Sequence, residues 1–426
     1  MKVIIQYITL ALTLLLQVDG FACSVCKVTI NGHTYLGNNE DNWRIGSRVW
    51  FEDRTFGNYG AVYVGYGDNF PQGGMNEAGL AFDGLTIYPK TIKPDPLKTT
   101  KTNSNTFIRE IMQNCATVED VMNYAIKFNR PFNKGVVFFA DKSGKYLVME
   151  PDTMTIGTDS KYIIANFCPS STSDEEKLIF ERYKRGNSFL RNHIDDTSSN
   201  YCLALVETMH ECRNKIGDGT MYSFIADLAA GDFSLYFYHD FNHKKIFNLK
   251  TELGKGNHSF EMTDIFPPNA EYRKLVDFKT PHNNGIMRML LICFEILFSF
   301  SALFFLVGFL RTKKSASHIN SANPQLKFVL FAVNALLLYY ANALLNNQAI
   351  FYFPSPYHDW KFSMLNIAAY IPFLMLILIV PLITQNVKIL KTTTWTTFCK
   401  TLYTLNSLAY LSLIFLFTYW KLYHVF

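Results

Sequence analysis

The sequence predicts an exported α+β domain followed by an all-α region of four transmembrane helices. Three observations predict this organisation. A short apolar segment opens the 426-residue chain, strand and helix signals alternate over residues 23–254, and four long apolar runs occupy the last third. Charged residues form 18% and aromatic residues 15% of the chain. This composition fits a protein that is partly soluble and partly embedded in lipid.

The first 22 residues have the pattern of a secretory signal peptide. Lys2 gives a short positive start, residues 3–18 are mostly apolar, and the small residues Gly20 and Ala22 suit a cleavage site. Cleavage after Ala22 makes Cys23 the first residue of the mature chain. An uncleaved anchor helix is the alternative, but the short apolar run and the two small residues favour cleavage.

Residues 23–254 are predicted to form antiparallel sheets with helices packed outside. Asn31–Gly32 is a strong hairpin signal, because both turn positions need positive φ. Thr117 and Asp120 have the spacing of a capping box that divides the first helical stretch. Strands are expected at 24–30, 33–38, 49–51, 61–66, 80–88, 136–139, 146–149 and within 221–241, and helices at 106–128, 173–193 and 200–213.

The remainder of the chain divides into a linker and a membrane region. Residues 255–285 contain three prolines and no apolar periodicity, and are predicted to be a linker. Residues 286–426 carry four apolar runs long enough to span a bilayer, at 289–310, 328–345, 364–383 and 402–420. Lysine and arginine gather in the first and third loops between these runs, which the positive-inside rule places in the cytoplasm. The preceding domain is therefore expected to be extracytoplasmic.

Charge and cysteine content argue against two classes of protein: nucleic-acid-binding proteins and small disulfide-rich proteins. The net charge of +5 comes without a basic block before residue 280, so no nucleic-acid partner is expected. Six of the eight cysteines precede residue 280, which is too few for a disulfide-dense framework. Cys202 and Cys212 are candidates for a bridge. Cys26 is expected to be a core thiol, since it faces away from Cys23 along the strand.

A cysteine at the start of a mature chain carries a thiol and an α-amine on one residue. The thiol can form a thioester with an acyl group, and the α-amine, with a reference pKa of about 7.7–8.0, can accept a proton near neutral pH. The hairpin brings Asp41 close to Cys23, so Asp41 is expected to hold the amine. A lipoprotein is the alternative, but Gly20 is not the aliphatic residue that lipoprotein processing needs.

Five segments form an ordered set of motifs over about residues 23–250. They read CSVCKVTINGHTYLGNNEDNW (23–43), GGMNEAGLAFDGL (73–85), YIIANFCP (162–169), FERYKR (180–185) and GTMYSFIADLAAGDFSLYFYHDF (219–241). The set resembles the linear-amide C–N hydrolases, which include choloylglycine hydrolases and penicillin acylases within the N-terminal nucleophile (Ntn) hydrolase superfamily. The resemblance implies an αββα sandwich that cleaves an amide through a thioester.

The resemblance also implies roles for individual residues. Cys23 would be the nucleophile, Asp41 the partner of its amine, Asn166 a donor to the oxyanion, and Arg182 an electrostatic support of the nucleophile. Arg185 is a near neighbour and an alternative to Arg182. In the competing interpretation, Asn166 is only a turn residue at a strand end.

Two positions depart from the choloylglycine hydrolase pattern. Asn38 stands where those enzymes have an arginine, and Thr86 stands where they have an asparagine donor. Asn38 cannot replace a charge, whereas Thr86 can still donate through its hydroxyl or backbone. Both are expected to contact substrate, and the changes argue against a close bile acid hydrolase.

The sequence therefore predicts a membrane-tethered, extracytoplasmic N-terminal-cysteine hydrolase of linear, non-peptide amide bonds. An acyltransferase of the penicillin-acylase type and a non-catalytic sensor or binding protein on the same fold are the alternatives. The expected partners are a small-molecule amide and the lipid bilayer. The aromatic-rich segment 351–362 favours amphipathic amides such as N-acyl amino acids, fatty acid amides or conjugated sterols. No cofactor and no metal is expected, and the oligomeric state is left open.

Overall fold

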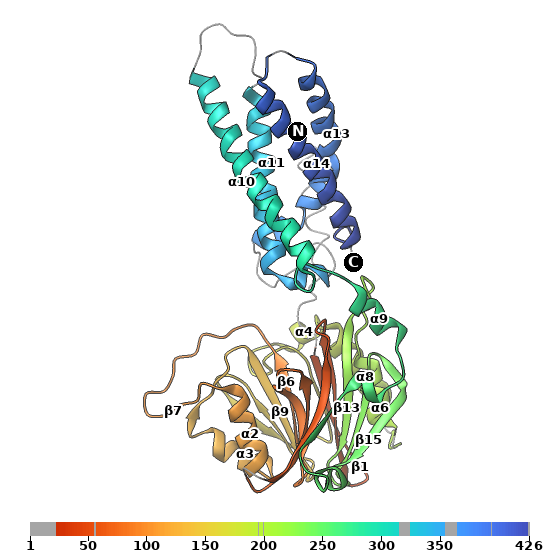
Figure 1. Ribbon diagram of the computed structural model, residues 1–426. Coiled ribbons are helices and arrows are strands. Elements are labelled where there is room, and N and C mark those ends of the chain that lie inside the picture. The colour runs from red at the N-terminus through yellow and green to blue at the C-terminus, as the bar shows by residue number, and fades with distance from the viewer. Residues whose placement is uncertain are drawn as a thin grey trace. The chain divides into compact units, whose positions relative to one another are not determined.

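The computed structural model describes residues 23–424, except 55–56, 195, 199, 315–323, 354–363 and 393. The predicted signal peptide and most of the aromatic segment 351–362 lie outside the described residues. The described chain forms a sheet-rich unit that ends at Val276 and a helical unit that follows it (Figure 1).

Two antiparallel sheets form the centre of the sheet-rich unit. The first sheet has the strand order β12 (Lys161–Ile164), β1 (Cys23–Ile30), β2 (His33–Asn42), β13 (Gly219–Asp227), β14 (Asp232–Phe237), β15 (Asp240–Asn248). The second has the order β11 (Met154–Gly157), β10 (Tyr146–Met149), β9 (Gly135–Asp141), β6 (Leu80–Thr86), β5 (Pro71–Asn76), β4 (Ala61–Tyr66), β3 (Ser47–Glu52), β16 (His258–Glu261). A short parallel pair, β7 (Thr99–Thr100) and β8 (Phe128–Asn129), lies apart from both sheets.

Helices cover the outer face of each sheet. Helices α2 (Ser104–Asn114) and α3 (Val118–Ala125) pack on the second sheet, where the fully buried Phe107 joins a core with Tyr63 and Phe139. Helices α5 (Glu181–Asn192) and α6 (Tyr201–Met209) pack on the first sheet. Burying one such side chain contributes about 2 kcal/mol. The layers therefore run helix, sheet, sheet, helix, and the expected αββα sandwich is confirmed.

Local sequence signals explain where these elements begin and turn. Asn31 and Gly32 have φ of 52° and 80°, so the hairpin between β1 and β2 forms where the dipeptide predicts it. Thr117 caps α3 through the capping box with Asp120. Strand β5 was not predicted, because its sequence PQGGMN lacks β-branched and aromatic residues.

Two expectations need correction. Within the predicted linker, strand β16 pairs with β3, and helices α8 (Met262–Ile265) and α9 (Ala270–Asp277) follow; residues 258–276 thus belong to the sheet-rich unit. The prolines do not make this segment a linker, because Pro267 and Pro268 lie between α8 and α9 rather than inside an element. The suggested Cys202–Cys212 bridge is also wrong: both are free, and Cys202 Sγ lies 3.9 Å from Cys26 Sγ.

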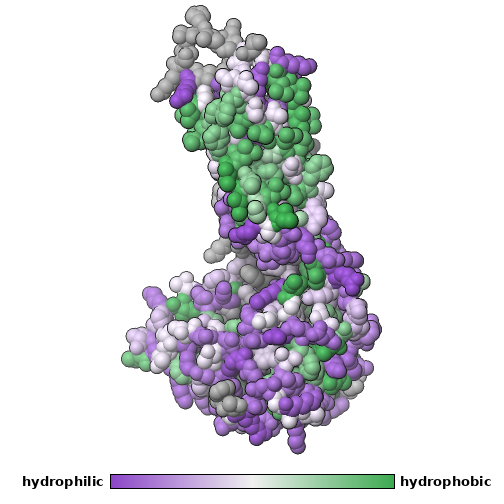
Figure 2. Space-filling view, in the orientation of Figure 1, coloured by the Kyte–Doolittle hydropathy of each residue, from purple (hydrophilic) through white to green (hydrophobic). Residues whose placement is uncertain are grey.

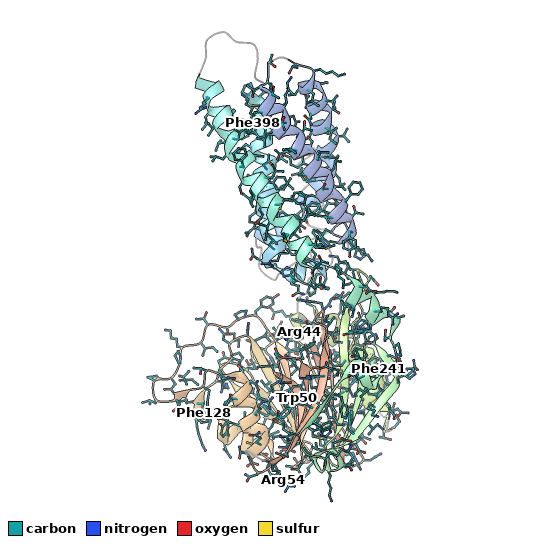
Figure 3. All side chains as sticks on the ribbon, viewed as in Figure 1. Arg44, Trp50, Arg54, Phe128, Phe241 and Phe398 are labelled. Atoms are coloured by element: carbon teal, nitrogen blue, oxygen red, sulfur yellow. The ribbon has the colours of Figure 1, made fainter. Side chains whose placement is uncertain are left out.

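The helical unit contains four helices that are long and apolar enough to cross a membrane, among the residues described. They are α10 (Gly285–Lys314), α11 (Pro324–Asn346), α13 (Ile371–Leu390), which is preceded by the short α12 (Met364–Ala368), and α14 (Thr397–Tyr419). Their outer surface is mainly apolar (Figure 2), and exposed side chains such as Phe398 of α14 stand on it (Figure 3).

Polar contacts join the helices inside this apolar unit. Asn406 Nδ2 donates to Ser301 Oγ at 2.8 Å, and Asn386 Nδ2 donates to Ser407 Oγ at 3.1 Å. Such pairs satisfy polar groups that have no water to bond in lipid. The four spans predicted from the sequence are thus present as helices of membrane-spanning length.

Candidate active site

Cys23 is the first residue of β1 and lies almost fully buried between neighbouring strands. Its side chain is directed toward Glu40: the thiol donates a hydrogen bond to Glu40 Oε2 at 3.4 Å. Its backbone nitrogen donates to Asn166 Oδ1 at 3.0 Å. The strand start therefore has one partner for its thiol and another for the nitrogen that would become the α-amine after cleavage.

Asn166 connects three parts of the site. It lies two residues beyond β12, whose antiparallel pairing with β1 brings it to the start of that strand. Asn166 Oδ1 accepts from Cys23 N and also from Arg182 Nη2 at 3.1 Å, while Asn166 Nδ2 donates to Thr86 O at 2.8 Å. Arginine can only donate, so the amide oxygen must face it. One N–H of the Asn166 amide is thus engaged by Thr86 O, and an oxyanion role for Asn166 would use the second N–H of the same group.

Arg182 joins Asn166 to a second carboxylate. It lies in the first turn of α5, where its side chain is 8% exposed, and its Nε is 3.5 Å from Asp41 Oδ2. Thr220, directly opposite Asp41 in the sheet register, donates to the other carboxylate oxygen. Arg185 instead donates to the carbonyls of Thr208 and His210 at the end of α6. Of the two candidate arginines, the structure brings Arg182 to the site.

The side chain nearest to the thiol is Glu40, which the sequence analysis missed. The register pairs Cys23 with Glu40, so these two side chains share one face of the sheet. Asp41, one residue further, faces the opposite side, toward Arg182 and Thr220. The β1–β2 register contains this information: counting back from the Asn31–Gly32 turn places residue 40, not 41, across from residue 23.

A buried acidic centre surrounds the thiol on the inner face of the sheet. Asp83 of β6 accepts from Asn38 Nδ2 at 2.8 Å, and Tyr66 OH approaches Glu40 Oε1 at 3.5 Å. Tyr222 pairs with Glu40 across β13, and its buried hydroxyl has no hydrogen-bond partner among the described residues. Two carboxyl groups and two phenols therefore share a space that is shielded from solvent.

Burial governs the protonation of this centre. It raises the pKa of Glu40 to about 8, and it raises the pKa of Asp83 well above its usual value, with Glu40 adding to the rise. Burial, followed by Glu40, Asp41 and Asp83, also raises the pKa of the Cys23 thiol, against a lowering contact from the backbone of Asp41. Thiolate is consequently scarce at neutral pH. Nucleophilic attack needs a nearby proton acceptor, and the Glu40 carboxylate is in contact with the thiol.

Asn38 and Thr86 have different surroundings from those expected of substrate contacts. Asn38 is fully buried; it donates to Asp83 and accepts from Phe224 N at 3.1 Å, so it links the two sheets. Thr86 contributes its backbone carbonyl to Asn166, while its side chain is exposed. Asn38 is thus held between the two sheets by its own contacts, and the backbone of Thr86 is bonded to the amide of Asn166.

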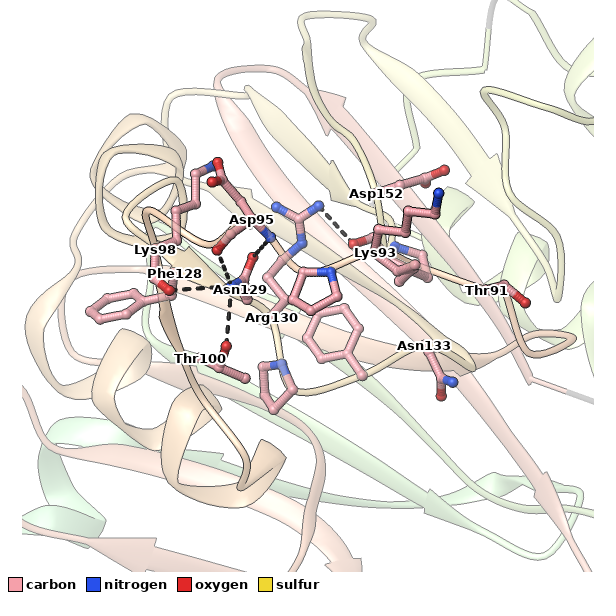
Figure 4. A pocket seen from close by; sticks show the side chains of 15 residues that line it. Thr91, Lys93, Asp95, Lys98, Thr100, Phe128, Asn129, Arg130, Asn133 and Asp152 are labelled. Atoms are coloured by element: carbon pink, nitrogen blue, oxygen red, sulfur yellow. Dashed lines mark hydrogen bonds between the residues drawn. The ribbon is translucent and has the colours of Figure 1, made fainter.

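A surface pocket of about 640 Å³ lies elsewhere in the sheet-rich unit (Figure 4). It is lined by segments around Lys93, Asn129 and Asp152, and Asn129 Nδ2 bonds to the carbonyl oxygens of Asp95 and Lys98 inside it. None of the residues bonded to Cys23 lines this pocket. The chemistry at Cys23 and this surface pocket are thus separate features.

Comparisons with known proteins agree with the motifs. Residues 31–234, just under half of the chain, match the family model described as acyl-coenzyme A:6-aminopenicillanic acid acyl-transferase. No curated protein matches the chain. The sheet-rich unit is therefore similar to this acyl-transferase family over residues 31–234. The match begins after Cys23, so it does not include the residue predicted to be the nucleophile.

Solved structures with a similar fold include two enzymes. Two variants of conjugated bile acid hydrolase from Clostridium perfringens are 15% and 17% identical, with TM-scores of 0.47 and 0.45; the alignments cover 58% of this chain and 99% and 97% of theirs. Penicillin V acylase from Agrobacterium tumefaciens is 14% identical, with a TM-score of 0.42, over 57% of this chain and 86% of that one.

Replacing Arg182 with alanine is expected to destabilise the protein by about 3–5 kcal/mol, because it leaves the buried Asp41 carboxylate without its cation. Thermal unfolding of the detergent-solubilised chain measures the effect, and labelling of Cys23 by an electrophile measures the loss of site order. Arg185→Ala is the matched control, with a smaller expected effect since its side chain is 40% exposed. Equal effects of the two substitutions would contradict the assignment.

Proposed function

We propose that the chain is a membrane-tethered, extracytoplasmic hydrolase that cleaves linear, non-peptide amide C–N bonds through a thioester on Cys23. The observation that carries this proposal is the pair of hydrogen bonds made by Cys23 at the start of β1. There the nitrogen of Cys23 bonds to Asn166 at 3.0 Å while its thiol bonds to Glu40 at 3.4 Å. A nucleophile with a proton acceptor in contact and an oriented backbone nitrogen is the requirement for covalent acyl chemistry.

The proposed reaction starts when signal cleavage after Ala22 frees the α-amine of Cys23. Asp41 Oδ2 is buried and accepts no hydrogen bond from the described residues, which leaves it able to accept one from this amine. The sulfur then attacks the amide carbonyl, and the thiol proton passes to Glu40 or to the α-amine. The same group returns the proton to the departing amine, and a thioester remains on Cys23.

The second half of the reaction releases the acyl group. A water molecule attacks the thioester carbonyl, the acceptor takes a proton from that water, and the sulfur leaves to regain a proton. The products are a carboxylic acid, an amine and the original thiol. Because the pKa of the Cys23 thiol is raised, its thiolate is a poor leaving group. Return of a proton to the sulfur when the thioester breaks therefore matters as much as removal of the thiol proton when the thioester forms.

The family model favours one alternative, in which an amine rather than water accepts the acyl group. Both reactions share the thioester and differ only in its acceptor. The test incubates the purified full chain with a panel of N-acyl amides, with and without an added amine, and identifies the products by mass spectrometry. Hydrolysis predicts free acid in both incubations. A new amide in the presence of the amine would establish acyl transfer, and no turnover together with no thioester would contradict both reactions.

We also propose that the catalytic domain faces away from the cytoplasm and meets its substrate near the membrane. The four helices of spanning length and the lysines and arginines in the first and third connections support this placement. Amphipathic amides, such as N-acyl amino acids, fatty acid amides or conjugated sterols, suit an enzyme held at a bilayer. Including short soluble amides in the panel tests this preference, since equal rates on short and long acyl chains would contradict it.

A further inference from the structure

A second cluster of reactive side chains lies in the sheet-rich unit, away from the Cys23 contacts. It combines Cys212, which follows α6; His239, in the turn between β14 and β15; and Glu271, in the first turn of α9. One ligand atom from each residue lies within 4.8 Å of the others. His239 Nδ1 and Glu271 Oε2 lie 3.9 Å apart. Three segments that are distant in the sequence thus present sulfur, nitrogen and oxygen donors to one point.

His239 distinguishes this cluster from a chance grouping of surface side chains. Its side chain is only 8% exposed, yet neither ring nitrogen has a hydrogen-bond partner among the described residues. A buried polar nitrogen without a partner is costly, and native proteins rarely leave one unsatisfied. An imidazole whose ring nitrogens have no other partner can bind a metal ion through either of them.

The frame that holds the three side chains is formed by hydrogen bonds of its own. Tyr238, next to His239, donates its hydroxyl to Gly217 O at 3.0 Å, which ties the turn to the loop after Cys212. Asn269 donates to Tyr238 O at 3.1 Å and accepts from Glu271 N at 2.9 Å, which ties the same turn to α9. The backbone segments that carry the three residues are therefore held in place before any ion binds.

We propose that Cys212, His239 and Glu271 form a binding site for a divalent transition metal of the zinc type. A thiolate, an imidazole and a carboxylate are the donors that zinc takes, whereas calcium and magnesium prefer oxygen alone. Tetrahedral zinc needs donors about 3.3–3.7 Å apart. Cys212 and Glu271 are exposed, so rotation of their side chains can close the remaining distance. The sequence predicts no metal site here, because these residues are 27 or more positions apart and match no ligand-spacing motif.

The surroundings of the cluster allow a positive ion. Arg213, the residue after Cys212, forms an ion pair with Asp218 at 2.8 Å, which offsets its charge. The ring of His210 lies 6.0 Å from that of His239, centroid to centroid, and is a candidate fourth ligand beside water. Three protein donors with a further position open to water or His210 is a common zinc arrangement.

Metal binding would also order a segment that supports the Cys23 site. Glu211, the residue before Cys212, lies 3.7 Å from Arg182, and its backbone nitrogen donates to Thr220. Both of those partners contact Asp41. A metal ion bound to Cys212 would therefore restrain the neighbouring Glu211, and with it the contacts that hold Arg182 and Asp41. The inference of the metal site itself does not depend on the proposed amidase activity.

The experiment measures metal content and binding in the full chain purified in detergent without chelators. Elemental analysis is expected to find about one equivalent of zinc per chain. Cobalt(II) added to the metal-stripped protein should give a sulfur-to-cobalt charge-transfer band, because a thiolate is among the ligands. Cys212→Ser should remove this band, and His239→Asn should abolish stoichiometric zinc while Asn still tolerates the φ of 61° at that position.

Matched controls separate this site from general affinity for metals. His243→Asn lies in the same hairpin and removes an exposed histidine that bonds to Asp240, so it should leave zinc content and the cobalt band unchanged. Cys23→Ala should also keep the band, which excludes the other candidate thiol. Failure of the wild-type chain to retain zinc or to give the band would overturn the proposal. Equal binding by the Cys212, His239 and His243 variants would overturn it as well.

Discussion

Replacing Cys23 with alanine is expected to lower amide cleavage by at least about 10⁴-fold and to remove the acyl-enzyme entirely. The thiol is the only group at the start of β1 that can form a covalent thioester, and removal of a covalent nucleophile leaves only binding and polar stabilisation. The measurement combines steady-state turnover with intact mass spectrometry of the substrate-treated protein. Alanine keeps the small side chain that signal cleavage needs on either side of the bond.

Cys26→Ala is the matched control for this substitution. Cys26 lies three residues along the same strand, but its thiol packs against Cys202 on the opposite face. The variant should lose some stability through a small cavity and keep both the acyl-enzyme and turnover. If Cys23→Ala retains a covalent acyl adduct, or if only Cys26→Ala loses it, Cys23 is not the nucleophile.

Replacing Glu40 with glutamine is expected to lower kcat by about 10²–10⁴-fold with little change in KM. The amide keeps the size of the side chain but cannot take the thiol proton, whereas the carboxylate accepts it directly at 3.4 Å. In the wild type the rate should rise with pH toward the pKa of Glu40 of about 8, as the acceptor form becomes populated. The variant should lose this part of the pH profile. A kcat within a few-fold of wild type would assign proton acceptance to the α-amine instead.

The same substitution should change how stability depends on pH. The pKa of Glu40 is raised in the folded state from 4.5 to about 8, so the folded state holds its proton after the unfolded state has released it. Stability from this group is present below about pH 4.5 and is lost as pH rises through about 8. Glu40→Gln removes that loss, so its unfolding temperature should fall less between about pH 5 and 8. Asp41 and Asp83 retain their own contributions to the slope, in the same direction.

The sequence predicts the framework of the site because the framework depends on local signals. Asn31–Gly32 defines the first hairpin, and the hairpin places residues 38–42 beside Cys23. Asn166 could be placed from its motif and from the strand before it. These features need only turn chemistry and strand periodicity, which are properties of short segments.

The details that the sequence did not predict depend on register and on contacts between distant segments. A shift of one residue in the β1–β2 pairing decides whether Glu40 or Asp41 shares a face of the sheet with Cys23. A motif match locates both residues in the sequence but does not give this pairing. Asn38 was expected at the substrate, but its partner Asp83 comes from the other sheet. The strand at 258–261 joins β3 across more than 200 residues, and no local pattern indicates that pairing.

The most direct test of the account is the intact mass of the purified mature protein before and after treatment with a thiol-reactive acyl substrate analogue. The account predicts a chain that starts at an unmodified Cys23 and gains one acyl adduct, located at Cys23 by peptide mapping. A chain that retains the first 22 residues has no free α-amine at Cys23, and a lipid on the Cys23 sulfur blocks the thiol. Either result would contradict the Ntn mechanism.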